Sequence, residues 1–201
     1  MSLDLSAATE GELAALTLAG RQAAFAEIMR RHRDPIFRLV QAHLGSADDA
    51  LDVVQESFVA AFVHLRRYDG ARPMRAWLSR IAINKARDFR RKAAVRRLLR
   101  NGFAEAETQL LSLADDRPSA DQEYDGRAQL QRIGAAISNL PHKLKEPLLL
   151  RAIEGLSQSE TAMTLRISEK AVETRIRRAR IKLREALDIT EQSGRTVRGK
   201  P

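Results

Sequence analysis

Hydrophobic residues recur every three to four positions along most of the chain, the spacing that gathers them on one face of an α-helix. No segment shows a convincing alternation of apolar and polar residues, the pattern of a half-buried strand. Over residues 21–100 the spacing predicts three amphipathic helices. Pro35 interrupts or bends the first helix and Gly45 ends it. Ser46 can cap the second helix, and Pro73 suits the first turn of the third.

A second stretch of helical pattern, residues 127–188, predicts four shorter helices. Ser157 and Glu160 have the spacing of a capping box, and Ser168 can cap a longer basic helix that follows a tight turn. A short helix, a turn and a basic helix make the arrangement of a helix-turn-helix. Arg166 stands where such turns usually place glycine, and a left-handed backbone there would cost about 1 kcal/mol.

Charge divides the chain into the same two parts. The 201 residues include 35 Lys and Arg against 26 Asp and Glu, a formal net charge of +9. The net charge is −3 over residues 1–20, +10 over 21–100, −6 over 101–126 and +8 over 127–201. Because the acidic block also loses the helical period, we predict two basic domains joined by a flexible acidic linker. The basic domains indicate a polyanionic partner.

The predicted fold is therefore all-α, with two small helical domains. Its parts are an N-terminal tail with the start of the first helix (1–20), a first helical domain (21–100), the acidic linker (101–126), a second helical domain containing the helix-turn-helix (127–188) and a disordered polar tail (189–201).

Composition excludes several classes of protein. The chain has no cysteine, so disulfides, thiolate metal sites and thiol redox sensing within it are excluded. Its four histidines lie far apart, without the spacing of metal ligands. No stretch approaches the roughly 18 apolar residues of a membrane span, and the N-terminus lacks the basic start of a secretory signal. We expect a cytoplasmic protein without metal, cofactor, catalytic residue or membrane insertion.

The last predicted helix carries candidate contacts to duplex DNA. They share its outward face, its flanks or its cap: Ser168, Lys170, Glu173, Thr174, Arg175, Arg177 and Arg178. Lys170 could reach the acceptor atoms of guanine, and Glu173 could accept a hydrogen bond from a cytosine amino group. The arginines suit phosphate neutralisation. The alternative is a helical hairpin with a solvated basic face.

The second predicted helix has two distinct faces. One is apolar and expected to be buried, Phe62 included. The other combines polar side chains with two apolar ones: Asp52, Gln55, Glu56, Val59 and Val63. Acids in a strongly basic domain suit protein docking better than DNA binding. From the spacing alone, a docking surface and a solvated face remain equally open.

The third predicted helix carries a stripe of polar side chains, three of them basic: Arg80, Asn84, Arg87 and Arg91. Tyr68, Trp77 and Phe89 lie nearby in sequence, so a basic track with an aromatic ring or two could hold unstacked bases. The spacing of Trp77 with its apolar neighbours favours a place in the core instead.

Three segments of the chain resemble the extracytoplasmic-function sigma factors, the small sigma subunits of bacterial RNA polymerase. Residues 49–58 are similar to the family's Asp-Ala-x-Asp-x-x-Gln-Glu-x-Phe run. Residues 72–84 resemble its Arg-Pro-Phe-x-x-Trp-Leu-x-x-Ile-Ala-x-Asn run, and residues 140–187 resemble its C-terminal DNA-binding module. The matching blocks cover residues 21–92 and 127–187, in the family's order and at its separations.

The resemblance implies a role for each surface. Asp52, Gln55 and Glu56 would dock on the coiled coil of the β′ subunit of core RNA polymerase. The helix starting at Ser168 would read the −35 element of promoter DNA as duplex. The residues that would recognise the melted −10 element are Arg67, Arg72, Arg80, Asn84, Arg87 and Arg91. The acidic linker would run toward the RNA exit path, and the controlling partner would be an anti-sigma factor.

Three residues depart from the family's pattern. Met74 replaces the usual aromatic, Glu173 stands where a base is often found, and Arg166 replaces the usual turn glycine. A free-standing helix-turn-helix regulator would account for the second domain but would leave Asp52, its neighbours and the basic stripe without a role. An enzyme acting on nucleic acid is not supported, because no catalytic cluster or phosphate-binding loop is found.

Overall fold

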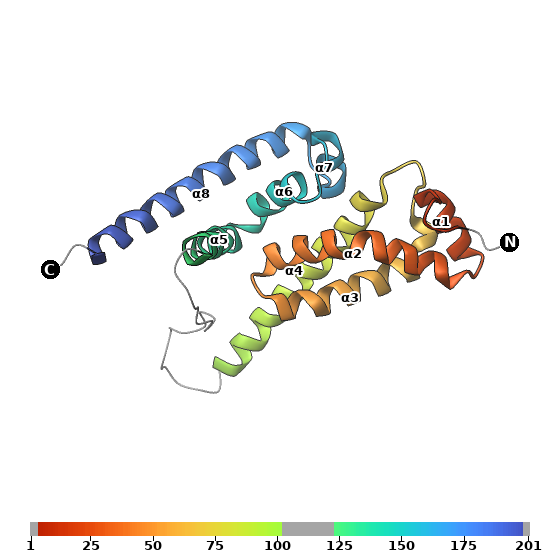
Figure 1. Ribbon diagram of the computed structural model, residues 1–201, viewed down its shortest axis with the longest axis horizontal. Coiled ribbons are helices and arrows are strands. Elements are labelled where there is room, and N and C mark those ends of the chain that lie inside the picture. Colours follow the sequence, from red (N-terminus) through yellow and green to blue (C-terminus); the bar gives the residue numbers. More distant parts are fainter. Residues whose placement is uncertain (1–3, 102–122, 199–201) are drawn as a thin grey trace.

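The computed structural model describes the backbone of residues 4–101 and 123–198, and the side chains of residues 4–99 and 129–188. All regular structure in these ranges is helical, which confirms the all-α prediction (Figure 1). The elements are α1 (Glu10–Leu18), α2 (Gln22–Leu44), α3 (Ala47–Val63), the 3₁₀ turn η1 (Leu65–Arg67), α4 (Met74–Asn101), α5 (Glu123–Ser138), α6 (His142–Ala152), α7 (Gln158–Leu165) and α8 (Glu169–Arg198). None of the described helices combines the length and the hydropathy needed to cross a membrane.

Helices α2, α3 and α4 pack together as a bundle, and α1 packs against α2 (Figure 1). Residues 1–20 were predicted to form an N-terminal tail and the start of the first helix, but within them α1 forms a separate helix that ends before α2 begins. A capping box between Thr9 and Glu12 starts the helix, and Leu13 is fully buried in the same hydrophobic cluster as Ile28 and Leu39. The cap and this burial together stabilise a helix of only nine residues.

The predicted C-terminal end of α2 and the predicted start of α3 are confirmed. Pro35 lies inside α2, and Gly45 ends it with a left-handed backbone of φ 85°. The Ser46 hydroxyl accepts a hydrogen bond from the backbone N–H of Asp49 and so caps α3. The expected burial of Phe62 was wrong. Its side chain lies at the margin of the buried face and is 49% exposed. The ring of Phe25 packs against it edge-to-face, at a centroid distance of 5.0 Å, and covers only part of it.

The second module, α5 to α8, contains the predicted helix-turn-helix in α7 and α8. Both halves of the capping box between Ser157 and Glu160 are present, and Ser168 accepts from the backbone N–H of Ala171 at the start of α8. Arg166 has the left-handed backbone expected at the turn, with φ 56° and ψ 49°. The disordered tail predicted from residue 189 was wrong for the described part of that stretch. There α8 continues to Arg198, with no proline to break it.

The structure describes only the two ends of the predicted acidic linker. Residues 102–122 lie outside the described ranges, and with them most of the acidic stretch. Residues 123–126, which we assigned to the linker, form the start of α5.

The two modules pack against each other. Helices α5 and α6 lie against α2, and α7 lies against α4 (Figure 1). Leu149 and Leu150 of α6 and Leu156 of the following loop belong to the same buried cluster as the core of the first module. Full burial of one leucine side chain contributes about 2 kcal/mol. Part of the second module therefore packs into the core of the first, while the buried apolar residues of α7 and α8 lie outside that cluster.

Candidate nucleic-acid and protein-docking surfaces

The acidic face of α3 is open to solvent. Asp52, Gln55 and Glu56 are exposed, while Val53 and Ser57, on the opposite face of the helix, are buried. The face continues into three exposed apolar side chains: Leu51, Val59 and Val63. We refer to Asp52, Gln55, Glu56, Val59 and Val63 as the α3 docking surface.

Two exposed valines beside carboxylates have no evident role in the fold. Val59 and Val63 are each 65% exposed, and each would gain about 1.5 kcal/mol on full burial by a partner. The Glu56 carboxylate lies 3.3 Å from the ammonium of Lys85 on α4, at the surface, where such a pair is readily exchanged for another cation. The chemistry suits a partner that offers basic side chains beside an apolar patch.

The residues predicted for the −10 element come from three neighbouring elements. Arg67 ends η1, Arg72 lies in the turn after it, and the others form a stripe along one side of α4: Arg80, Asn84, Arg87 and Arg91. The Tyr68 hydroxyl donates a 2.6 Å hydrogen bond to the Arg72 carbonyl and orders that turn. We refer to the four α4 residues as the α4 stripe.

Trp77, which follows the turn, is half-buried and packs on the hydrophobic core, as its spacing predicted. Its other contact is the ring of Tyr68, at a centroid distance of 5.4 Å. The two aromatic rings therefore brace the start of α4.

The second module borders the middle of the α4 stripe, where Arg80 is half-buried while Asn84 and Arg87 remain exposed. A cleft of about 190 Å³ has Arg80, Asn84 and Arg87 on one side, and on the other the C-terminal end of α7 with its turn, Thr164 to Arg166. Partial burial lowers the pKa of Arg80, and the like charges of Arg166 and Arg72 add to this effect. The helix-turn-helix therefore stands directly over a predicted DNA contact.

Arg87 is held by a carboxylate of the second module. Its Nε donates a 2.6 Å hydrogen bond to Oε1 of Glu146 on α6, and its Nη2 donates to Oε2 of the same residue. Glu146 is only 2% exposed, and Nε2 of His43 on α2 lies 3.5 Å from its Oε1. Burial by itself would raise the pKa of Glu146, but the hydrogen bonds from Arg87 and His43 outweigh it and lower that pKa to about 2. The carboxylate is therefore charged and fully engaged.

Lys145, the residue before Glu146, also bridges the modules. Its side chain is fully buried, and its ammonium donates to the carbonyl of His43 at 3.1 Å and to that of Ser138 at 2.5 Å. Burial, with Arg90 nearby, lowers its pKa to about 8. Neither Lys145 nor Glu146 was among the functional residues predicted from the sequence. Their signal was a charged pair inside an otherwise apolar run, Leu144 to Leu150.

On α8 the predicted −35 contacts divide between two sides of the helix. Lys170 and Thr174 lie one turn apart, and the Thr174 hydroxyl donates to the Lys170 carbonyl. The Lys170 ammonium lies 2.9 Å from the carboxylate of Glu173, a pair that lowers the pKa of Glu173. Ser168, Lys170 and Arg178 are exposed, and Arg175 is half-buried.

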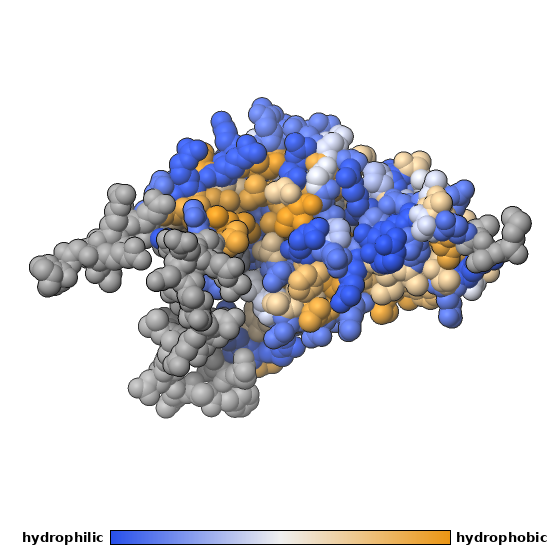
Figure 2. All heavy atoms as spheres, viewed as in Figure 1, coloured by the Kyte–Doolittle hydropathy of each residue, from blue (hydrophilic) through white to orange (hydrophobic). Residues whose placement is uncertain are grey.

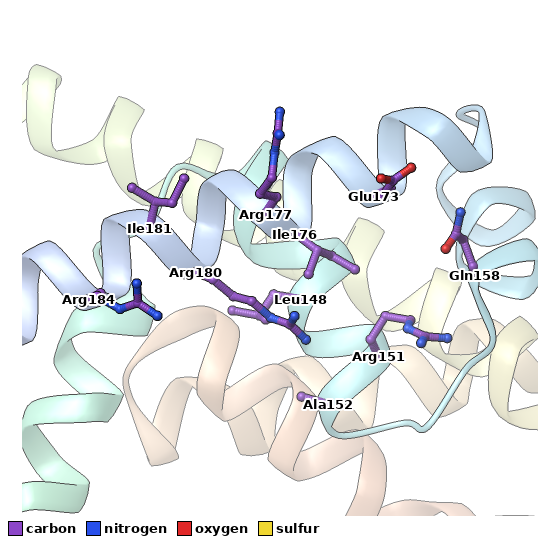
Figure 3. A pocket seen from close by; sticks show the side chains of 10 residues that line it. All are labelled: Leu148, Arg151, Ala152, Gln158, Glu173, Ile176, Arg177, Arg180, Ile181 and Arg184. Atoms are coloured by element: carbon purple, nitrogen blue, oxygen red, sulfur yellow. The ribbon is translucent and has the colours of Figure 1, made fainter.

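Glu173 and Arg177 are among the residues that line a groove between α6 and α8, and in Figure 3 the Arg177 side chain extends away from α6. The groove has a volume of about 630 Å³. Its apolar lining residues are Leu148, Ala152, Ile176 and Ile181. Figure 2 shows the apolar patch between α6 and α8, bordered by hydrophilic side chains. The basic residues at its margin are Arg151, Arg177, Arg180 and Arg184.

A helix-turn-helix in one module, a basic helix in the other and a separate exposed acidic face fit a promoter-binding protein of the transcription apparatus. The family described as Sigma-70 region 2 matches residues 28–97, and Sigma-70, region 4 matches residues 130–183. The chain belongs to the extracytoplasmic-function sigma factors, which bind core RNA polymerase and direct transcription initiation at specific promoters.

Individual relatives are similar in sequence over most of the chain. RNA polymerase sigma factor CnrH of Cupriavidus metallidurans is 39% identical over 181 residues, which are 90% of this chain and 95% of that protein. The sigma factor SigW of Bacillus subtilis is 32% identical over 84% of this chain and 91% of that protein. A solved structure of CnrH in complex with the cytosolic domain of CnrY has a TM-score of 0.66 and 34% identity, covering 90% of this chain and 97% of that one.

Proposed function

We propose that three surfaces divide the work of this sigma factor. The α3 docking surface binds the coiled coil of the polymerase β′ subunit. The α4 stripe, with Arg67 and Arg72, holds the melted −10 element, and the outward face of α8 reads the −35 duplex. The observation that carries the proposal is the exposure of Asp52, Gln55 and Glu56 beside two exposed valines, on a face the fold itself does not use.

The docking assignment rests on chemistry that the rest of the first module lacks. That module is strongly basic, so an exposed acidic cluster within it attracts a basic partner and not DNA. The valines would supply the apolar centre that such an interface needs.

Association with core polymerase tests this assignment. The double variant Asp52→Ala, Glu56→Ala should lose most of its binding to core polymerase, measured by the change in fluorescence anisotropy of labelled chain. Asp34→Ala removes an exposed acid on α2 that is not part of the α3 docking surface, and this variant should bind as the wild type does. Equal affinity of the double variant and the wild type would show that the docking surface lies elsewhere.

The −10 assignment rests on the basic, partly exposed stripe and its neighbouring turn. Melted strands are held by charge along the backbone and by stacking of unpaired bases, and opening a base pair costs a few kcal/mol that protein contacts must offset. In holoenzyme, Arg80→Ala with Asn84→Ala should reduce open-promoter formation, scored by permanganate reactivity of unpaired thymines, while leaving assembly with core polymerase unchanged.

A controlling partner is the next part of the proposal. The related CnrH has been solved with the cytosolic domain of CnrY, and we infer that an anti-sigma factor likewise covers surfaces of this chain. Because the chain has no cysteine, any thiol signal would be sensed by that partner. We further propose that the chain acts in the cytoplasm with the polymerase and has no catalytic activity of its own.

A further inference from the structure

Arg87 is engaged by Glu146 in the manner in which arginine binds phosphate. Two parallel N–H donors of one guanidinium meet the two oxygens of one carboxylate. A phosphodiester offers the same pair of anionic oxygens at similar spacing, which is why bidentate arginine recognises both groups. Arg87 therefore cannot make this contact with Glu146 and with a DNA phosphate at the same time.

The burial of Glu146 depends on closure of the modules. A carboxylate that is 2% exposed is costly unless it is paired, and its two partners, Arg87 and His43, both belong to the first module. When the modules separate, water replaces both partners and the carboxylate is solvated. When they are closed, loss of Arg87 leaves a buried charge with a weaker partner.

Other groups hold the modules at the same place. The ammonium of Lys145 joins a carbonyl of each module, and Nη1 of Arg90 lies 3.4 Å from the His43 carbonyl that also accepts from Lys145. Farther along, Nη2 of Arg75 lies 3.7 Å from a carboxylate oxygen of Glu160 on α7. Charged groups of the second module thus meet α4, or the end of α2 beside it, at several points.

The closed arrangement leaves Asn84 and Arg87 exposed but places the second module beside the part of the α4 stripe that a melted strand would follow. Asn84 and Arg87 line both the cleft below Arg166 and a second cleft beside Leu140 and Pro141, at the loop between α5 and α6. A strand whose phosphate binds Arg87 through both of these donors would have to displace Glu146.

We propose that Glu146 is an autoinhibitory residue: it takes the place of a −10 phosphate at Arg87 and keeps the free chain closed against single-stranded DNA. Engagement with the polymerase, which must separate the −10 and −35 surfaces along a promoter, exchanges Glu146 for DNA at Arg87. The inference rests on the proposed function, because it takes the α4 stripe to be the −10 surface.

The first test replaces the carboxylate by its isosteric amide in the full chain, Glu146→Gln. Closure is followed without DNA, by energy transfer between dyes on Asp34→Cys and Lys182→Cys, two exposed sites on different modules of a chain that has no cysteine of its own. Affinity is measured in unlabelled protein with a fluorescent single-stranded oligonucleotide carrying the −10 sequence. Glu185→Gln, an exposed change of the same charge on α8, is the matched control.

We expect Glu146→Gln to lower energy transfer and to raise affinity for the oligonucleotide about tenfold, as the binding-competent fraction rises. The control should change neither. Unchanged energy transfer, or opening without a gain in affinity, would overturn the inference. Failure of the proposed function is seen separately: Arg80→Ala with Asn84→Ala, made in the opened Glu146→Gln chain, would then bind the oligonucleotide as tightly as before.

A covalent clamp keeps the inference testable if Glu146→Gln folds poorly. A Cβ at Gly45 would lie 3.2 Å from Cβ of Ser138, so Gly45→Cys with Ser138→Cys needs only a small shift to reach the roughly 3.5–4.5 Å of a disulfide. The left-handed backbone at Gly45 strains the variant equally in its oxidised and reduced forms. We expect oxidation to abolish oligonucleotide binding and a reductant to restore it. Equal binding by the two forms would contradict autoinhibition.

Discussion

The carboxylate of Glu10, the first residue of α1, accepts a 2.8 Å hydrogen bond from the backbone N–H of Met74, the first residue of α4. The first turn of a helix has N–H groups without partners in the helix itself, and this side chain, 64 residues away in sequence, satisfies one of them. The other oxygen of Glu10 lies 2.9 Å from Nε2 of His32 on α2. One side chain therefore ties α1 to both α2 and α4.

Replacing Glu10 should destabilise the first module. Glu10→Ala removes an acceptor that acts as a cap from another helix, and we expect a loss of about 1–2 kcal/mol in the free energy of unfolding. Urea denaturation followed by circular dichroism measures it. Asp34→Ala removes an exposed acid on α2 and should change the free energy little. If the two variants are equally stable, Glu10 does not cap α4.

Lys145 should make stability depend on pH. Burial, with Arg90 nearby, lowers its pKa to about 8 in the folded chain, from an ordinary value of 10.5. Between these two values the unfolded chain binds the proton more often, so this contribution to stability rises with pH. Below pH 8 the folded chain bears the full penalty of the buried charge.

The measurement compares wild type with Lys145→Met in urea at pH 8 and at pH 10. The free energy of unfolding of the wild type minus that of the variant should be greater at the higher pH. Taking this difference removes the contributions of titrating groups common to both proteins. A difference that is constant or falls with pH would show that the ammonium is not held at a lowered pKa.

Arg166 should respond to substitution through its backbone. At φ 56° a residue with a side chain is strained by about 1 kcal/mol, while glycine is not. Stability should therefore rank Arg166→Gly above Arg166→Ala, and Arg166→Ala above the β-branched Arg166→Val. Thermal unfolding gives the order. If valine is tolerated as well as glycine, the strain argument fails.

The two sides of α8 should give different DNA phenotypes. Arg178→Ala removes an exposed cation suited to phosphate, so binding to all duplexes should weaken by a similar factor. Glu173→Ala also frees Lys170 from its 2.9 Å ion pair, so preference among −35 sequences should change by about 1–3 kcal/mol. A panel of single-base variants of the duplex distinguishes them. A uniform loss with Glu173→Ala would mean that Glu173 serves the α6–α8 groove alone.

The elements predicted correctly from sequence are those specified by local contacts. The Ser157–Glu160 capping box, the Gly45 stop and the left-handed Arg166 each depend on residues within one turn of the chain, so spacing alone reveals them. Exposure of the docking residues also followed, because Asp52 and Glu56 lie opposite the buried period of their helix.

What sequence reasoning missed depends on contacts between distant residues. The Thr9–Glu12 capping box is a local signal for α1 that was overlooked, whereas the packing of α1 on α2 and the exposure of Phe62 beside Phe25 depend on distant contacts. The pairing of Arg87 with Glu146 spans 59 positions, so each residue by itself resembled a solvated charge. Two basic domains indicated a shared polyanionic ligand but not that a carboxylate of one domain would pair with a predicted DNA contact of the other.

The burial of Glu146 has a consequence for ionic strength. At 0.1 M salt, mobile ions largely screen the interaction between exposed charges that lie more than about 10 Å apart. They screen a carboxylate that is 2% exposed far less effectively. DNA binding through phosphates weakens steeply as salt rises, because releasing counterions into a more concentrated solution gains less entropy. Rising ionic strength therefore shifts Arg87 from DNA toward Glu146, and a cell that concentrates its salts under osmotic stress would favour the closed chain.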